Sequence, residues 1–131
     1  MHKGSCLCGT IQYEIDGPLG PIIYCHCSRC RKANGSAFSA VSQVATADLR
    51  IVKGEEALRG FDNGKGVHRM FCGNCGSPLF SKRDAMPDMR RLRIGTLDTP
   101  IEGKVSAHIF VDSKAEWYDI CGDAPRYAEF P

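Results

Sequence analysis

The chain has 131 residues, 43% of them hydrophobic and 24% charged, which is the composition of a single soluble domain large enough to bury a core. No apolar run approaches the roughly 18 residues that cross a bilayer, so we expect no membrane-spanning helix. The formal net charge of +2 counts every cysteine as neutral, so it is no argument for nucleic-acid binding, and we expect neither a nucleic acid nor a membrane as a partner.

The N-terminal residues do not form a secretory signal, because Lys3 is not followed by an apolar stretch. We therefore expect the protein to be cytoplasmic. The eight cysteines could formally make four disulfides, but disulfides need an oxidising compartment. Free or metal-bound cysteines are the better expectation.

Short β-like segments separated by turns make up most of the chain. Residues 10–15 alternate polar and apolar side chains as a half-buried strand does, and a turn signal at residues 16–18 ends this strand. After an apolar run at residues 22–24, residues 28–34 predict a short helix with Ser28 as N-cap and Gly35 at its end. Further strands are expected at residues 37–44, 49–52, 67–71, 79–81, 91–94 and 108–111. The pattern favours a mainly β, single domain over residues 1–131 rather than a βαβ fold.

A short basic stretch lies in the second half of the chain and consists of Arg83, Arg90, Arg91 and Arg93. Asp84 and Asp88 interrupt it, and charge runs of mixed sign are usually solvated. We therefore interpret this stretch as a solvated loop rather than as a binding surface.

Seven of the eight cysteines fall into three clusters: Cys6 and Cys8, then Cys25, Cys27 and Cys30, then Cys72 and Cys75. Two residues between cysteines allow both sulfurs to reach one tetrahedral zinc ion at about 2.3 Å. Gly73 and Gly76 permit the tight turn that this requires. Two such pairs from distant parts of the chain would close a four-thiolate structural site, and a pair separated by one residue can serve as the partner.

The middle cluster offers three sulfurs within six residues, an odd number that suits no set of disulfides. Three protein ligands and one vacant position are typical of a catalytic zinc site. The alternative is a closed site whose fourth ligand is a histidine: His2, His26, His68 or His108. The spacing leaves open which clusters pair, since an ordinary zinc ribbon would join Cys27 and Cys30 to Cys72 and Cys75. Seven thiolates and two zinc ions would lower the net charge to about −1.

Four segments resemble one known family when they are taken together. They are GSCLCG at residues 4–9, CHCSRCRK at 25–32, FCGNCGSPL at 71–79 and HIFVDSKAEW at 108–117. In this order they resemble the glutathione-dependent formaldehyde-activating enzymes, whose domain is shared with centromere protein V. The resemblance extends from residue 4 to about residue 125.

The resemblance implies how the cysteines are divided between two zinc ions. Cys6, Cys8, Cys72 and Cys75 would hold a structural ion, and Cys25, Cys27 and Cys30 a functional one. It also implies a β-tent fold of short antiparallel strands stapled by zinc.

The activity implied is that of a carbon–sulfur lyase that joins a small thiol, such as glutathione, to a small aldehyde. The thiol would be held as a thiolate on the open three-cysteine zinc. Arg29, Arg31 and Lys32 could attract the carboxylates of glutathione, although solvent-facing side chains on a short helix are the plainer interpretation. The rival function is a non-catalytic zinc module that binds glutathione or a protein partner, and the motifs fit both.

Several other residues have a plain structural interpretation. His26 lies between two ligands, so its side chain is expected to point away from their metal, and His108 is expected to be a half-buried, hydrogen-bonded histidine. Cys121 stands alone and is expected to be a buried or inert thiol. Trp117 and Tyr118 are expected to pack in the core or at its edge.

Overall fold

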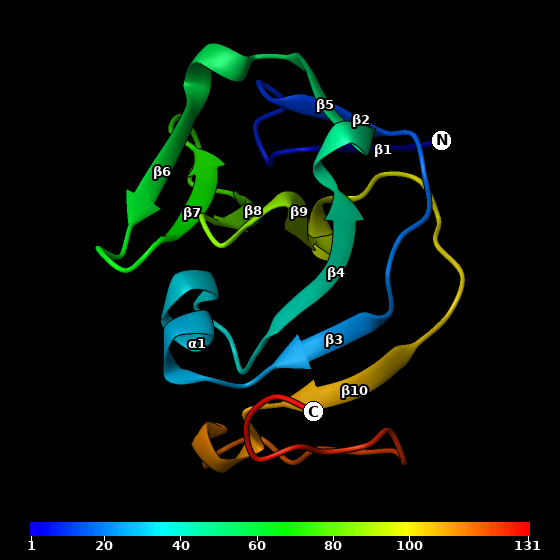
Figure 1. Ribbon diagram of the computed structural model, residues 1–131, viewed down its shortest axis with the longest axis vertical. Helices are drawn as coiled ribbons and strands as arrows, with labels where there is room; N and C mark the ends of the chain where they lie inside the picture. Colours follow the sequence, from blue (N-terminus) through cyan, green and yellow to red (C-terminus); the bar gives the residue numbers. More distant parts are fainter. The chain divides into compact units, whose positions relative to one another are not determined.

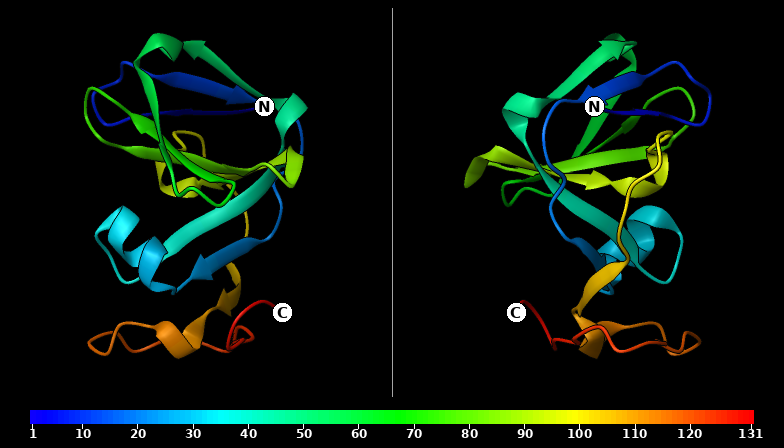
Figure 2. Two further views of the ribbon diagram at one scale, coloured as in Figure 1. Left: turned by 60° about the vertical axis from the view of Figure 1, so that its left-hand side comes forward. Right: turned by 90° about the vertical axis from the view of Figure 1, so that its right-hand side faces the viewer.

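A computed structural model describes all 131 residues and contains ten β-strands, one α-helix and four 3-10 turns. The predicted mainly β fold is confirmed. The chain divides into two compact units, each assembled from two separate segments. Unit 1 comprises residues 1–20 and 42–101, and unit 2 comprises residues 21–41 and 102–131. The elements of both units are labelled in Figure 1 and shown from two further directions in Figure 2.

Unit 1 contains two antiparallel arrays of strands. The first has the order β1-β2-β5, and the second contains β9-β8-β7-β6. The bounds are β1 (His2–Ser5), β2 (Gln12–Ile15), β5 (Leu49–Lys53), β6 (Leu58–Asp62), β7 (Val67–Cys72), β8 (Pro78–Arg83) and β9 (Met86–Arg93). Three short 3-10 turns, η1 (Thr46–Asp48), η2 (Glu55–Ala57) and η3 (Ile94–Thr96), connect the strands.

The core of unit 1 follows the predicted alternation. Ile11, Tyr13 and Ile15 are buried, and together with Leu79 and Leu92 they belong to one apolar cluster. A side chain of this size contributes about 1.5–3 kcal/mol when it is fully buried. The Tyr13 hydroxyl lies 2.6 Å from Thr96 Oγ1, and burial raises the pKa of Tyr13 to about 12.

Two strands of unit 1 were not predicted, and one interpretation is wrong. β1 and β6 are edge strands, and their sequences lack the alternation on which the prediction relies. The basic stretch is not a solvated loop, because Arg83 ends β8 and the other three arginines lie in β9. Arg93 is only 8% exposed.

Unit 2 contains β3 (Ile22–Cys25), α1 (Ser28–Asn34), β10 (Val105–Ile109) and η4 (Val111–Ser113), and β4 (Ser39–Ala45) begins in it. β3 pairs antiparallel with β4 but parallel with β10, so the expectation of antiparallel strands alone is wrong at this pair. The chain after β10 returns alongside that strand. The His108 N–H donates to Pro125 O, and the Phe110 N–H donates to Glu129 O.

Helix α1 has the predicted bounds but a different N-cap. Cys27, not Ser28, is the capping residue, and its sulfur accepts a hydrogen bond from the Cys30 N–H at 3.3 Å. Gly35 ends the helix in the left-handed conformation, with φ of 63°, as predicted.

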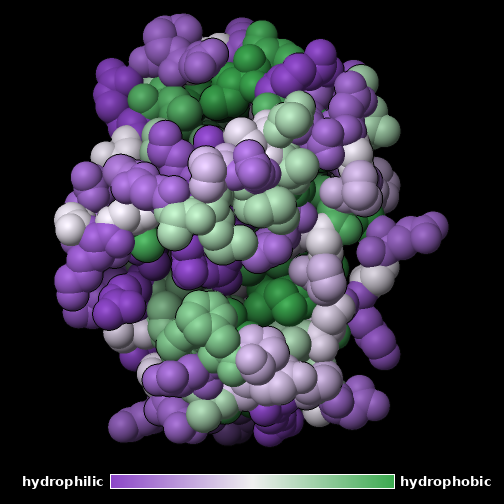
Figure 3. All heavy atoms as spheres, viewed as in Figure 1, coloured by the Kyte–Doolittle hydropathy of each residue, from purple (hydrophilic) through white to green (hydrophobic).

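No helix of the structure is long and apolar enough to cross a membrane. In Figure 3, hydrophilic residues, drawn in purple, are interspersed with apolar ones on the visible face. Leu7 and Phe61 are among the large apolar side chains that are exposed.

Gly54 and Gly64 provide a matched test of the packing in unit 1. Both have positive φ, 79° and 75°, but only at Gly54 would an added Cβ collide with the carbonyl oxygen of Thr10. Gly64→Ala should therefore lower the free energy of unfolding by about 1 kcal/mol, the usual left-handed penalty. Gly54→Ala should cost about 3 kcal/mol, because overpacking adds to that penalty. Urea denaturation measures both, and equal losses would contradict the close approach at Thr10.

Candidate metal centres

Four cysteines of unit 1 bring their sulfurs together. The Sγ atoms of Cys6, Cys8, Cys72 and Cys75 all lie within 4.8 Å of one another. Cys6 Sγ is 3.6 Å from Cys8 Sγ, which is 4.0 Å from Cys72 Sγ. Sulfurs arranged tetrahedrally around zinc at about 2.3 Å would be roughly 3.8 Å apart, so the spacing fits this ion. The group could hold one metal ion.

Tight turns at both cysteine pairs place these sulfurs. After Cys72, the Gly76 N–H donates to Cys72 O at 2.7 Å, and Gly76 has the positive φ of 82° that this turn needs. The Asn74 N–H donates to Cys72 Sγ at 3.4 Å. In the first turn, the Ile11 N–H donates to Cys6 Sγ at 3.3 Å. Backbone amides directed at sulfur stabilise thiolates, which are the form that binds a metal.

The electrostatics of this group also favour thiolates at two of its members. Hydrogen bonding with Thr10 and with Asn74 lowers the pKa of Cys8 to about 7. Hydrogen bonding by Ser77 lowers the pKa of Cys75 to about 5. Burial has the opposite effect on Cys72, whose pKa is raised.

The second group lies entirely in unit 2. Cys25 ends β3, Cys27 caps α1 and Cys30 lies in its first turn, and their three sulfurs are within 4.8 Å of one another. Cys25 Sγ and Cys27 Sγ are 3.6 Å apart, again close to the tetrahedral spacing. Cys25 and Cys30 donate hydrogen bonds to Cys27, which lowers the pKa of Cys27 to about 2, and the same contact raises the pKa of Cys25. This group could hold a second metal ion.

The histidines do not join either sulfur group. His26 and His108 are both buried, and His26 Nε2 lies 2.9 Å from His108 Nδ1. This pairing agrees with the expectation that His26 points away from the ligands and that His108 is hydrogen-bonded, although His108 is fully rather than half buried. His68 instead contacts Asp84 at 3.0 Å.

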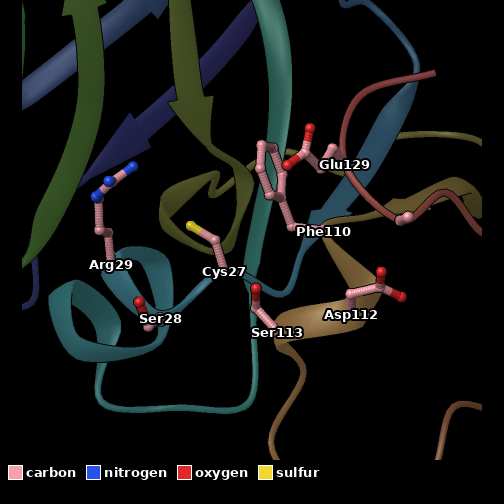
Figure 4. A pocket seen from close by; sticks show the side chains of 8 residues that line it. Cys27, Ser28, Arg29, Phe110, Asp112, Ser113 and Glu129 are labelled. Atoms are coloured by element: carbon pink, nitrogen blue, oxygen red, sulfur yellow. The ribbon is translucent and has the colours of Figure 1, made fainter.

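A pocket of about 230 Å³ opens beside the three-cysteine group. It is lined by Cys27, Ser28, Arg29, Phe110, Asp112, Ser113, Ala128 and Glu129. In Figure 4 the sulfur of Cys27 is directed toward the side on which Arg29 lies, and the Phe110 ring lies on the other side of Cys27. Arg29 is the one residue of Arg29, Arg31 and Lys32 that lines this pocket, and Asp112 and Glu129 carry the opposite charge.

Phe110 adopts an uncommon backbone conformation at the pocket wall. Its φ is 57°, in the left-handed region, which costs a residue other than glycine about 1–2 kcal/mol. The Phe110 ring packs edge-on against Phe130 at 4.9 Å, and this contact helps to hold the conformation. The sequence segment at residues 108–117 indicated part of this wall, but no sequence signal pointed to Glu129.

Two other interpretations need correction. Trp117 is 73% exposed and is not a core residue, whereas Tyr118 does pack against His26 and Phe38. Cys121 is exposed and lies outside both sulfur groups, so it is not a buried thiol.

The mainly β fold and the two cysteine groups define a small candidate metal-binding protein. The sequence profile of the family described as glutathione-dependent formaldehyde-activating enzyme matches residues 1–113, and the chain belongs to this family. Relatives from Aspergillus flavus and Aspergillus oryzae, provisionally named glutathione-dependent formaldehyde-activating enzymes, are each 26% identical over 127 residues, or 95% of this chain. The chain spans 58% of the length of these relatives.

A solved structure is similar as well. The crystal structure of a Rhodobacter sphaeroides protein superimposes with a TM-score of 0.65 and 25% sequence identity. The match covers 79% of this chain and 96% of that one. The fold described above is therefore one that occurs in a protein solved by crystallography.

The two sulfur groups predict two zinc ions per chain. Seven clustered thiolates cannot all bind one tetrahedral ion, so elemental analysis of protein purified without chelator should approach a ratio of two. A ratio that stays at one after incubation with excess zinc would contradict a metal site in the three-cysteine group.

Loss of a ligand should have unequal effects in the two groups. Cys75→Ser opens a cluster that joins residues 6 and 72, so it should lower stability by on the order of 3 kcal/mol, or roughly 10 °C in Tm. Cys27→Ser changes a group contained within residues 25–30 and should shift Tm much less while removing one zinc ion. Thermal melts combined with metal analysis check this, and equal shifts in Tm would contradict the different roles.

Proposed function

We propose that this protein is a zinc-dependent enzyme of the carbon–sulfur lyase type, which joins a glutathione-like thiol to a small aldehyde or reverses that addition. Cys25, Cys27 and Cys30 would hold the functional zinc, and Cys6, Cys8, Cys72 and Cys75 a structural one. The observation that carries the proposal is that Cys27 both belongs to the three-sulfur group and lines a pocket.

Three protein ligands leave a tetrahedral ion one position for substrate. Zinc bound there would supply a site that holds the sulfur of the incoming thiol as a thiolate near neutral pH. No histidine belongs to this sulfur group, which supports an open site over a closed one.

The addition changes no oxidation state. The thiol gives up its proton to water, and its sulfur forms a bond to the carbonyl carbon of the aldehyde. The electron pair of the carbonyl π bond moves to oxygen, which takes a proton from water. The protein therefore has to orient the two reactants, and orientation alone can lower the activation barrier by several kcal/mol.

The pocket beside Cys27 suits a thiol that carries both charges. Arg29 can pair with a carboxylate, and Asp112 and Glu129 can pair with an ammonium group. Glutathione has both kinds of group in its γ-glutamyl part. The Phe110 ring provides an apolar wall between these charges.

Seven cysteines must stay reduced to bind metal, so we also propose a reducing compartment such as the cytoplasm. The two units are further proposed to act as one domain over residues 1–131, because each of them is assembled from two separated segments.

Thiol binding at the three-cysteine group can be tested with a matched pair of ligands. Glutathione should bind the zinc-loaded protein, and binding should strengthen as the pH rises toward the thiol pKa, about 8.5, because ligation needs the deprotonated sulfur. S-methylglutathione, which cannot form a thiolate, should bind at least about tenfold more weakly, a difference of about 1.4 kcal/mol. Calorimetry measures both affinities, and cobalt substitution should add a sulfur-to-metal charge-transfer band with glutathione only.

The control variant is Cys27→Ser, which should abolish the difference between the two ligands. A turnover assay with a panel of thiols and aldehydes then separates catalysis from binding. Tight thiol binding without turnover of any pair would favour the rival function, a non-catalytic module. Equal binding of glutathione and S-methylglutathione would remove the thiol-activating site altogether.

A further inference from the structure

Four arginines gather on one face of the strands β7, β8 and β9 in unit 1. Arg69 of β7 is directly opposite Ser81 of β8, which is directly opposite Arg91 of β9. Arg83 and Arg93 follow Ser81 and Arg91 by two positions, so strand alternation places them on the same face. A hydrogen bond from Arg93 Nη1 to Ser81 Oγ, at 3.3 Å, agrees with this placement.

This face is distinct from the core of unit 1. The residues that alternate with the arginines include Cys72 and Leu92, which both belong to the buried apolar cluster. Ser81 itself is only 4% exposed and sits in the middle of the row. The long arginine side chains therefore stand around a small, buried hydroxyl.

No carboxylate of β6 to β9 lies beside Arg69 or Arg91 on this face. The residues that alternation places on it from β6 to β9 include no aspartate or glutamate. Asp84, at the turn, contacts His68, and Asp88 is exposed and lies where the pairing of β8 with β9 is irregular. Arg69 and Arg91 lie on the two strands that flank β8, about 10 Å apart, so their like charges repel each other.

Arg69 and Arg91 also lack ion-pair partners. Neither of them takes part in the ion pairs of Arg50 and His68, and Arg69 Nε is buried without a hydrogen-bond partner. A buried donor without a partner destabilises the fold. An anion on this face would offset the repulsion between the two arginines, because it would pair with both charges. It would also accept a hydrogen bond from the Arg69 Nε–H.

We propose that Arg69, Ser81 and Arg91 form the centre of an anion-binding site that takes a compact dianion such as phosphate or a dicarboxylate. The planar guanidinium fork suits the two oxygens of a carboxylate or phosphate group. Ser81 Oγ adds a polar group at the centre. The proposal needs neither zinc nor thiol chemistry, so it stands apart from the proposed function.

Arg90 supplies a matched control, because it neighbours Arg91 in β9 and alternates to the other face. Its Nη1 already donates to Pro87 O and Met89 O. Arg91→Gln and Arg90→Gln change the net charge by the same amount. Only the first removes a guanidinium from the proposed site.

Calorimetric titration of the zinc-loaded protein with inorganic phosphate, at fixed ionic strength, tests the site. Arg69→Gln and Arg91→Gln should each weaken phosphate binding at least about tenfold, and Arg90→Gln less than about twofold. Arg91→Lys keeps the charge but removes the planar guanidinium group, so it should also weaken phosphate binding. This variant provides the test if Arg91→Gln does not fold. Equal losses in Arg90→Gln and Arg91→Gln would overturn the proposal, since they would show a net-charge effect.

Two competition experiments identify the class of anion. Succinate competing with phosphate would support a dicarboxylate, and glutathione competing with phosphate would assign the site to the carboxylates of the thiol substrate. Phosphate affinity unchanged in all four variants would mean an adventitious ion only and would overturn the site. Phosphate binding that follows the predicted order would support it even if no thiol binds at the three-cysteine group.

Discussion

Unit 1 depends on the meeting of four sulfurs that come from its two chain segments. Cys6 and Cys8 belong to the first segment of the chain, whereas Cys72 and Cys75 belong to the segment that resumes at residue 42. Around them lie Ile11, Leu79 and Leu92 of the same buried cluster. A metal ion bound by these four cysteines would cross-link the two segments of unit 1 at this point.

The three-cysteine group follows a different logic. Its members lie within six residues, and local structure alone brings their sulfurs together, since Cys27 caps the helix that contains Cys30. A metal ion held by this group would close only a short loop, so it would add little to the stability of the fold. A site that stabilises the fold little can retain an open ligand position at small cost, and it is this group that adjoins a pocket.

The sequence predicted the elements whose signal is local. The alternation of Ile11, Tyr13 and Ile15, the bounds of α1 and the Gly35 stop were confirmed. Cysteine spacing identified the clusters, but their allocation came from family resemblance, because spacing carries no information on which distant turns meet. The arginine row and the pocket wall at Glu129 were missed for the same reason. The arginine row arises from strand register, and the pocket wall at Glu129 arises from a C-terminal segment that returns beside β10.

The division of each unit between two stretches of chain has a consequence for biosynthesis. A ribosome delivers residues in order, and residues 21–41 emerge before the strands that complete unit 1. Residues 21–41 cannot complete unit 2 until residues 102–131 have been translated. During that interval Cys25, Cys27 and Cys30 are available to oxidants and to competing metals, whereas unit 1 can close as soon as residue 101 has left the exit tunnel. Unit 1 is thus the part of the nascent chain that can fold first.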